Sequence, residues 1–291
     1  MSKPLNIVVL AKQVPDTKNV GKDAMKADGT VNRGALETIF NPEDLNALEV
    51  ALSIKERYPS KITILTMGPS KAADIIREGL FRGADDGVLL SDRKFAGSDT
   101  LATSYALSTT IKKMEYDLII AGRQAIDGDT AQVGPQVAEK LDLPQITYCE
   151  SVDSIENNEI IITRRLENGI EQVKGALPLV ITVNASAPDC RPRNAKLVMK
   201  YKHAVTTTEL QNMAEDYYAD IREQRPYLNI KEWGADFIEA EAEHLGLSGS
   251  PTKVKKIENV VFTAKEAKQL NSTDSDIESL VQELIANHTI G

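Results

Sequence analysis

Cysteine and histidine are scarce in this 291-residue sequence, and their scarcity excludes several kinds of site. The two cysteines, Cys149 and Cys190, lie far apart and outside any paired motif. This argues against a disulfide scaffold, a structural zinc site or an iron–sulfur cluster held by this chain. We expect Cys149, in an apolar segment, to be inert core. His203, His244 and His288 are scattered and adjoin no obvious acid or nucleophile, so we assign none of them catalysis and expect no metal site.

Positive charge and long apolar runs are also lacking. The net charge is −9, and we find no basic arm of the kind that binds nucleic acid. No apolar segment is long enough to span a bilayer, so we expect no membrane insertion. The first residues lead into a strand without the pattern of a signal peptide. The expected location is therefore cytoplasmic.

The most informative stretch is residues 117–137, DLIIAGRQAIDGDTAQVGPQV. It starts as a buried strand, breaks at Gly122, passes through a polar loop and enters a helix near Thr130. A helix N-terminus offers free backbone N–H groups and a dipole that favours negative charge, so this arrangement suits an anion. Gly122 and Gly128 allow close backbone approach or positive φ. Arg123 adds charged donors suited to phosphate.

The same stretch also suits an ordinary strand-to-helix connection whose glycines only turn the chain. It is neither G-x-G-x-x-G nor a Walker A loop, so neither of those mechanisms applies. Pro135 falls in an early turn if the helix starts at Thr130; otherwise the regular helix starts a few residues later. The local pattern leaves these alternatives open.

Strands and helices alternate over the first 145 residues, which predicts a doubly wound, mostly parallel sheet in an α/β fold. The strands are expected at Leu5–Leu10 and at residues 61–66, 88–90 and 117–121. Their ends at Ala11, Met67 and Gly122 could then surround one ligand.

The sequence Asn41-Pro42-Glu43-Asp44 predicts a helix start. Asn41 suits the N-cap position and Pro42 the first helical position. Asn41 could cap the helix only, or cap it and face a ligand at once. Residues 17–38 are polar and irregular, with a turn expected at Asp28-Gly29.

The second half of the chain differs in pattern. Antiparallel strands at residues 146–152, 159–166 and 170–174, then a buried strand at 177–183, predict an extension of the same sheet. Residues 204–291 cannot build a core of their own. We expect them to form an extended C-terminal arm that lies on the main domain or, by preference, on another chain. One apolar helix face near the end supports this; it consists of Ile277, Leu280, Val281, Leu284 and Ile285.

Four segments together resemble, in order, the β subunit of electron-transferring flavoproteins. They are Ala11-Lys12-Gln13-Val14-Pro15-Asp16, Asn41-Pro42-Glu43-Asp44, AGRQAIDGDTAQVGP at residues 121–135, and Gly249-Ser250-Pro251-Thr252. The resemblance implies a heterodimer with an α subunit that carries a mobile, electron-delivering FAD. It also implies a nucleotide-binding domain at residues 1–187, a partner-recognition loop at 188–203 and an arm at 204–291 that packs on the α subunit.

The family has a branch that holds AMP as a structural ligand and an electron-bifurcating branch that holds a second FAD in the same place. This sequence resembles the second branch, because the AMP branch tends to carry an acid where Gly128 stands here. Residues 91–103 also resemble that branch. Gly128 leaves room and avoids another carboxylate beside a pyrophosphate.

The resemblance implies roles for individual residues. Those expected around the adenosine part are Ala11, Asn41, Asp44, Thr66, Met67 and Gly68. Those expected near the ribityl chain or ring are Asp99, Thr100 and Thr103. Those expected at the pyrophosphate and its neighbouring groups are Arg123, Asp129, Thr130, Gln132 and Val133. Gly122 is also expected among the cofactor-binding residues. Arg123 is the best candidate for steering the flavin ring.

The segment at residues 192–197 resembles the family's partner-recognition loop, with Leu197 as the anchor; a basic solvated linker is the alternative.

The resemblance implies hydride transfer from NADH to the FAD held here. Electrons would then divide between the α-subunit flavin, serving an acyl-CoA dehydrogenase-type partner, and a low-potential acceptor such as ferredoxin. No side chain is expected to act as a general acid or base. The alternatives are a non-bifurcating carrier with AMP and a stand-alone nucleotide-binding α/β domain.

Overall fold

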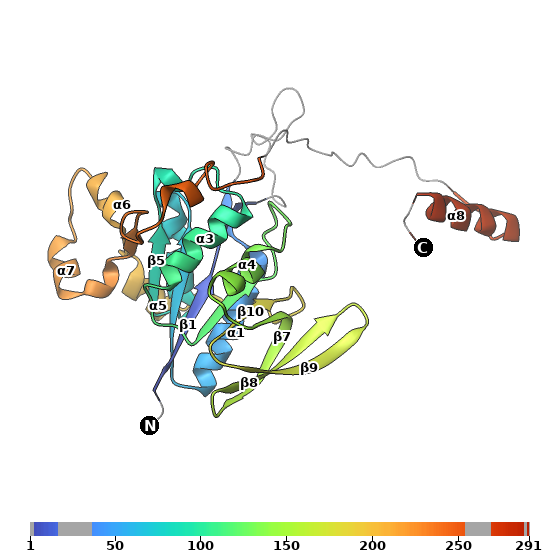
Figure 1. Ribbon diagram of the computed structural model, residues 1–291, viewed down its shortest axis with the longest axis horizontal. Helices are drawn as coiled ribbons and strands as arrows, with labels where there is room; N and C mark the ends of the chain where they lie inside the picture. Colours follow the sequence, from blue (N-terminus) through green and yellow to red (C-terminus); the bar gives the residue numbers. More distant parts are fainter. Residues whose placement is uncertain (1–2, 17–36, 254–268, 288–289, 291) are drawn as a thin grey trace. The chain divides into compact units, whose positions relative to one another are not determined.

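The computed structural model describes residues 3–16, 37–253, 269–287 and 290 (Figure 1). The chain divides into two compact units, Met1–Val254 and Lys255–Gly291, and each is described by itself. The turn expected at Asp28-Gly29 and the residue His288 lie outside the described residues.

A nine-stranded sheet forms the centre of the first unit. In spatial order its strands are β11 (Lys231–Trp233), β5 (Asp86–Leu90), β4 (Ser60–Met67), β1 (Leu5–Leu10), β6 (Leu118–Gly122), β10 (Leu179–Val183), β7 (Gln145–Glu156), β8 (Glu159–Leu166) and β9 (Gly169–Ala176). Neighbours from β11 to β7 pair in parallel, whereas β7, β8 and β9 pair antiparallel. The predicted parallel sheet with its antiparallel extension is therefore confirmed.

Helices cover both faces of the parallel part (Figure 1). Helices α1 (Pro42–Arg57) and α2 (Ala73–Arg82) pack on one face, and α3 (Thr100–Ile111) and α4 (Val133–Lys140) pack on the other. Because both faces are covered, the central strands carry continuous buried apolar runs, such as Ile7–Leu10 in β1 and residues 118–121 in β6. The remaining helices are η3 (Ser70–Ala72), η4 (Arg93–Phe95), α5 (Ala195–Tyr201), α6 (Thr207–Gln211), α7 (Ala219–Gln224), η5 (Pro226–Leu228), η6 (Ala242–His244) and α8 (Asp274–Ala286). A short antiparallel pair, β2 (Gln13–Pro15) and β3 (Thr38–Phe40), precedes α1.

The order of the strands reverses between β1 and β6. From β1 the chain moves outward to β4 and β5, then returns to place β6 on the other side of β1. In open α/β sheets, ligands bind beyond the carboxyl ends of the strands at such a switch point. The sequence predicted that the strand ends at Ala11, Met67 and Gly122 would lie together. They do share this edge, because β4, β1 and β6 are parallel neighbours.

Much of the segment that the sequence favoured for another chain lies on the α/β domain itself. Strand β11 extends the sheet beside β5, and the apolar side chains buried with it are Leu228, Ile230, Ala235, Ile238 and Leu245. These side chains have no helical or strand period, so their burial could not be recognised from the sequence. Packing of an arm on an α subunit stays a prediction.

The second unit is described only as α8 and a few flanking residues. No residue of α8, which is described throughout, is buried. Its predicted apolar face is present, with Ile277, Leu280, Val281 and Ile285 all exposed. Among the described residues, no helix combines the length and the apolarity needed to cross a bilayer.

Gly87 in β5 shows how closely α2 packs on the sheet. A Cβ atom there would lie 2.1 Å from the Cγ2 atom of Ile76. We expect Gly87→Ala to lower the free energy of unfolding by about 1–3 kcal/mol, the usual effect of overpacking a core. Urea unfolding measures this. Gly128→Ala is the matched control, because its Cβ would meet no described atom within 4 Å; equal stability of the two variants would contradict this packing.

Candidate functional site

The loop between β6 and α4 forms the centre of the site. Helix α4 begins at Val133, so the later of the two predicted starts is correct, and Pro135 lies in its first turn. Gln132 occupies the N-cap position, but its side chain makes no capping hydrogen bond within this described segment. The first amides of the helix are thus left for another acceptor.

The second half of this loop exposes a row of backbone donors. In the described part of the chain, the N–H groups of residues 130–134 bond to no backbone or side-chain acceptor. Asp129 and Ala131 have φ angles of 49° and 52°, in the left-handed region that costs energy for residues with a Cβ. Gln132 follows with right-handed backbone angles, and alternation of left- and right-handed residues is the pattern from which anion-binding nests are built.

In the first half of the loop, by contrast, backbone groups have hydrogen-bond partners, because side chains at the start of α1 bond to them. The Asn41 amide donates to the carbonyl of Gln124 (2.9 Å) and accepts from the N–H of Ile126 (3.2 Å). Glu43 accepts from the N–H of Gln124 at 3.0 Å. Asn41 stands at the predicted N-cap position, yet its side chain makes no cap hydrogen bond to α1, which is described throughout.

Asp44 connects the ends of the two central strands. Its carboxylate accepts from the N–H of Lys12 after β1 (2.8 Å) and from that of Gly122 in β6 (3.1 Å). A Cβ at Gly122 would lie 2.4 Å from Oδ1 of Asp44, so this glycine does permit the close approach that the sequence suggested. Burial raises the pKa of Asp44 to about 7, although both backbone hydrogen bonds oppose the rise.

Arg123 is engaged by the protein itself. Its Nη2 lies 3.0 Å from Oε1 of Glu43, and this pairing raises the pKa of the guanidinium. The guanidinium carbon lies 6.0 Å from the ring centre of Tyr148. At the outer end of the loop, Lys12 pairs with Asp127 at 2.7 Å. Two cations near the loop are thus already balanced by carboxylates.

The start of α3 lies beside the end of this loop. The Thr100 hydroxyl donates to Oε1 of Gln132 at 3.0 Å, which joins α3 to the loop. Asp99 caps α3 through the N–H groups of Leu101 and Ala102. Its second oxygen accepts from the N–H and hydroxyl of Thr252, at 3.0 and 2.7 Å. Thr103, predicted near the ribityl chain, is half-buried one turn along α3.

The motif Gly249-Ser250-Pro251-Thr252 therefore lies beside the start of α3, although none of its residues was among the predicted site residues. Ser250 is buried and accepts from the N–H of Asp99 at 2.8 Å. The signal was present in the sequence, because this motif carried part of the family resemblance.

At the end of β4, Thr66 is fully buried, and its hydroxyl has no hydrogen-bond partner among the described residues. Met67 and Gly68 follow it and are half-buried, while Ala11 is buried at the end of β1. Asp129 lies exposed across the loop, held by the side-chain amide of Gln124 at 3.2 Å. The structure thus gathers the predicted residues around one sheet edge, but several bond to the protein rather than face open space.

The predicted partner anchor, Leu197, lies on α5 and is half-buried against the core. Asn194 caps this short helix by accepting from the N–H groups of Lys196 and Leu197. Met199 on the same helix is 64% exposed. The role of Leu197 as an anchor stays a prediction.

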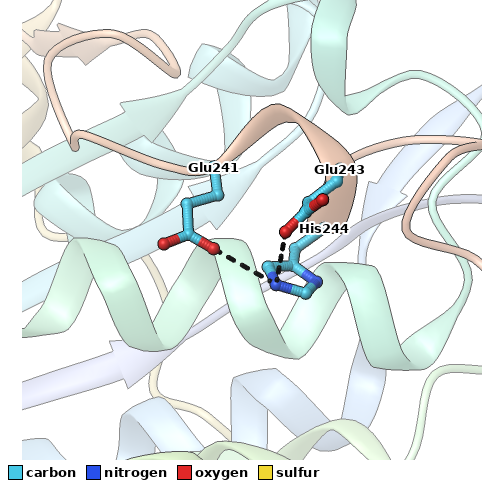
Figure 2. Close-up of side chains that lie close together, drawn as sticks. All are labelled: Glu241, Glu243 and His244. Atoms are coloured by element: carbon cyan, nitrogen blue, oxygen red, sulfur yellow. Dashed lines mark ion pairs between the residues drawn. The ribbon is translucent and has the colours of Figure 1, made fainter.

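A separate cluster on η6 brings His244 close to Glu241 and Glu243 (Figure 2). The expectation that His244 adjoins no acid is therefore wrong: its Nε2 lies 3.2 Å from Glu241 and 3.7 Å from Glu243. All three side chains are exposed, where ion pairs contribute little to stability. Geometry alone assigns no metal there.

The raised pKa of Asp44 gives a prediction. An acid with a higher pKa in the folded protein binds more protons when folded, so its contribution to stability falls as pH rises between the two pKa values. The contribution is full below pH 3.8 and is lost by about pH 7. Relative to Asp44→Asn, we expect the wild-type free energy of unfolding to decline across pH 4–7 and then level off. Urea unfolding at stepped pH checks this, and a rising or flat difference would contradict it.

Comparison with known proteins gives the family. The model of the electron transfer flavoprotein domain matches residues 28–211. The electron transfer flavoprotein subunit beta of Clostridium acetobutylicum is 42% identical over 252 residues, 87% of each chain. The acryloyl-CoA reductase electron transfer subunit gamma of Anaerotignum propionicum is 37% identical, with 98% of this chain and 100% of the relative covered. Caffeyl-CoA reductase-Etf complex subunit CarD of Acetobacterium woodii is 40% identical over 86% of each chain. With matches of this extent, this chain belongs to the electron transfer flavoprotein β-subunit family.

Proposed function

We propose that this chain is the β subunit of a cytoplasmic, electron-bifurcating electron transfer flavoprotein, and that the edge of its sheet at β4, β1 and β6 holds FAD. The observation that carries the proposal is the row of N–H groups at residues 130–134, at the switch point of the sheet, which have no acceptor in the described part of the chain. Amides arranged in this way favour the diphosphate of a dinucleotide.

The surrounding residues fit such a ligand. Gly128 stands before the cradle, and a side chain there would enter space that no described atom occupies within 4 Å. At the end of β4, where the adenosine part is expected, the buried hydroxyl of Thr66 finds no partner among the described residues. A buried polar atom without a partner costs free energy, and a ligand atom can remove that cost.

Arg123 and Lys12 do not supply the main attraction for phosphate, because Glu43 and Asp127 already pair with them. Backbone dipoles are left as the principal source of positive potential. Asp99, Thr100 and Thr103 are proposed beside the ribityl chain, where Thr100 holds Gln132 in place. These residues bind and orient; none is assigned a proton-transfer role.

When bound, FAD would accept hydride from NADH and pass electrons singly to the α-subunit flavin and to a low-potential acceptor such as ferredoxin. The chain contributes binding, orientation and electrostatics to this chemistry. One relative is named as an electron transfer subunit of acryloyl-CoA reductase and another as a subunit of a caffeyl-CoA reductase-Etf complex, which supports an acyl-CoA dehydrogenase-type partner for this chain. The α subunit is proposed to receive the apolar face of α8, and Leu197 is proposed to anchor the dehydrogenase.

A non-bifurcating carrier with AMP is the alternative, because a phosphate monoester would fill the same amide cradle. Extraction of nucleotides from the purified heterodimer separates the two functions. We expect two FAD per heterodimer. One FAD with one AMP would contradict bifurcation while leaving the amide cradle in place.

Gly128→Glu tests the placement of the phosphates. The new carboxylate would not disturb protein packing, since its Cβ meets no described atom, but it would stand beside a diphosphate. We expect FAD affinity to fall about tenfold or more, which corresponds to roughly 1.4 kcal/mol of charge repulsion. Gly128→Gln is the control of equal size and should keep its flavin. Equal loss in both variants would point to size rather than charge and would contradict the placement.

A further inference from the structure

Asn41 makes an unusual use of an N-cap position. Asn is a favoured cap because its side-chain oxygen accepts from the amides of the first helical turn. Here that oxygen accepts instead from the N–H of Ile126, and the amide nitrogen donates to the carbonyl of Gln124. The side chain therefore pairs with the loop as a peptide group of a neighbouring strand would. It is fully buried, and both of its polar side-chain atoms already have partners in the loop.

Glu43 binds the same loop residue, Gln124. Its carboxylate accepts from the N–H of Gln124, so both backbone polar groups of Gln124 bond to the first turn of α1. The same carboxylate pairs with Arg123, which fixes the side chain that leaves the end of β6. The loop is thus held at residues 122–126, whereas the N–H groups of residues 130–134 bond to no acceptor that the structure describes.

We infer that Asn41 and Glu43 are positioning residues, which hold the loop so that the amides of residues 130–134 converge on the phosphates without touching the ligand themselves. A side chain that supplies both a donor and an acceptor is required at position 41, since the loop presents a carbonyl and an N–H there. Aspartate lacks the donor, and serine is too short to make both bonds.

This inference rests on the proposed phosphate site, and its test compares Asn41→Ser with Asn46→Ser. The Asn41 side chain makes no cap hydrogen bond to α1, and serine is itself favoured at an N-cap, so Asn41→Ser leaves the start of the helix intact and removes the hold on the loop. Asn46 lies in the same helix, is also buried, and donates to the carbonyls of Ala187 and Pro188 at 3.0 and 2.9 Å. It is therefore matched in residue type, helix and burial.

The full chain is purified with its α subunit and stripped of nucleotide, and its affinities for AMP and for inorganic pyrophosphate are measured by titration. We expect Asn41→Ser to weaken both by at least tenfold, because a displaced cradle affects any phosphate ligand. Asn46→Ser should bind both as the wild type does. Asn41→Asp and Glu43→Gln extend the test if Asn41→Ser does not fold, and each should weaken both ligands in the same way.

Three results would overturn the inference. Equal affinities in Asn41→Ser and Asn46→Ser would make Asn41 an ordinary buried residue. Weakening of AMP alone, with pyrophosphate unchanged, would mean that Asn41 contacts the adenosine part directly. If the wild type binds neither ligand, the proposed phosphate site fails and the inference falls with it, whereas tight binding by both wild type and Asn41→Ser removes the inference alone.

Discussion

Hydrogen bonds between the first turn of α1 and the backbone at residues 122–126 decide how the rest of the site is arranged. Asp44 joins Gly122 to the residue after β1, while Asn41 and Glu43 hold Gln124 and Ile126. Because these side chains satisfy buried backbone groups, the loop can leave the sheet edge along a fixed course without losing hydrogen bonds. The backbone at residues 122–126 therefore fixes where the second half of the loop begins.

The second half of the loop contains strained backbone. Asp129 and Ala131 adopt left-handed backbone conformations that cost energy, and neither is glycine. Such conformations persist where the surrounding structure holds them, and they occur often at ligand sites. Here they adjoin the amides of residues 130–134, which have no acceptor among the described residues, while Arg123 and Lys12 pair with acids. Attraction of a phosphate by fixed dipoles needs no rearrangement of long, flexible side chains when the ligand arrives.

The sequence predicted the fold well where local patterns are strong. Short β-branched apolar runs such as Ile7–Leu10 favour strands buried on both faces, and alternation with helices then implies a parallel sheet. Prediction was weaker where the deciding contact is remote. Arg123 reads as a phosphate ligand because nothing nearby reveals that it pairs with Glu43, 80 residues earlier. Asn41 reads as a helix cap for the same reason, and residues 204–250 lack the periodicity that would have shown their burial.

Hydrogen–deuterium exchange at residues 130–134 tests the central claim most directly, since each N–H there lacks an acceptor among the described residues. Pro135 carries no N–H and marks the end of the row. The account predicts that these amides exchange quickly in the stripped heterodimer and slow markedly when FAD or AMP is added. Unchanged exchange at these amides, with protection appearing elsewhere on the chain, would contradict the account.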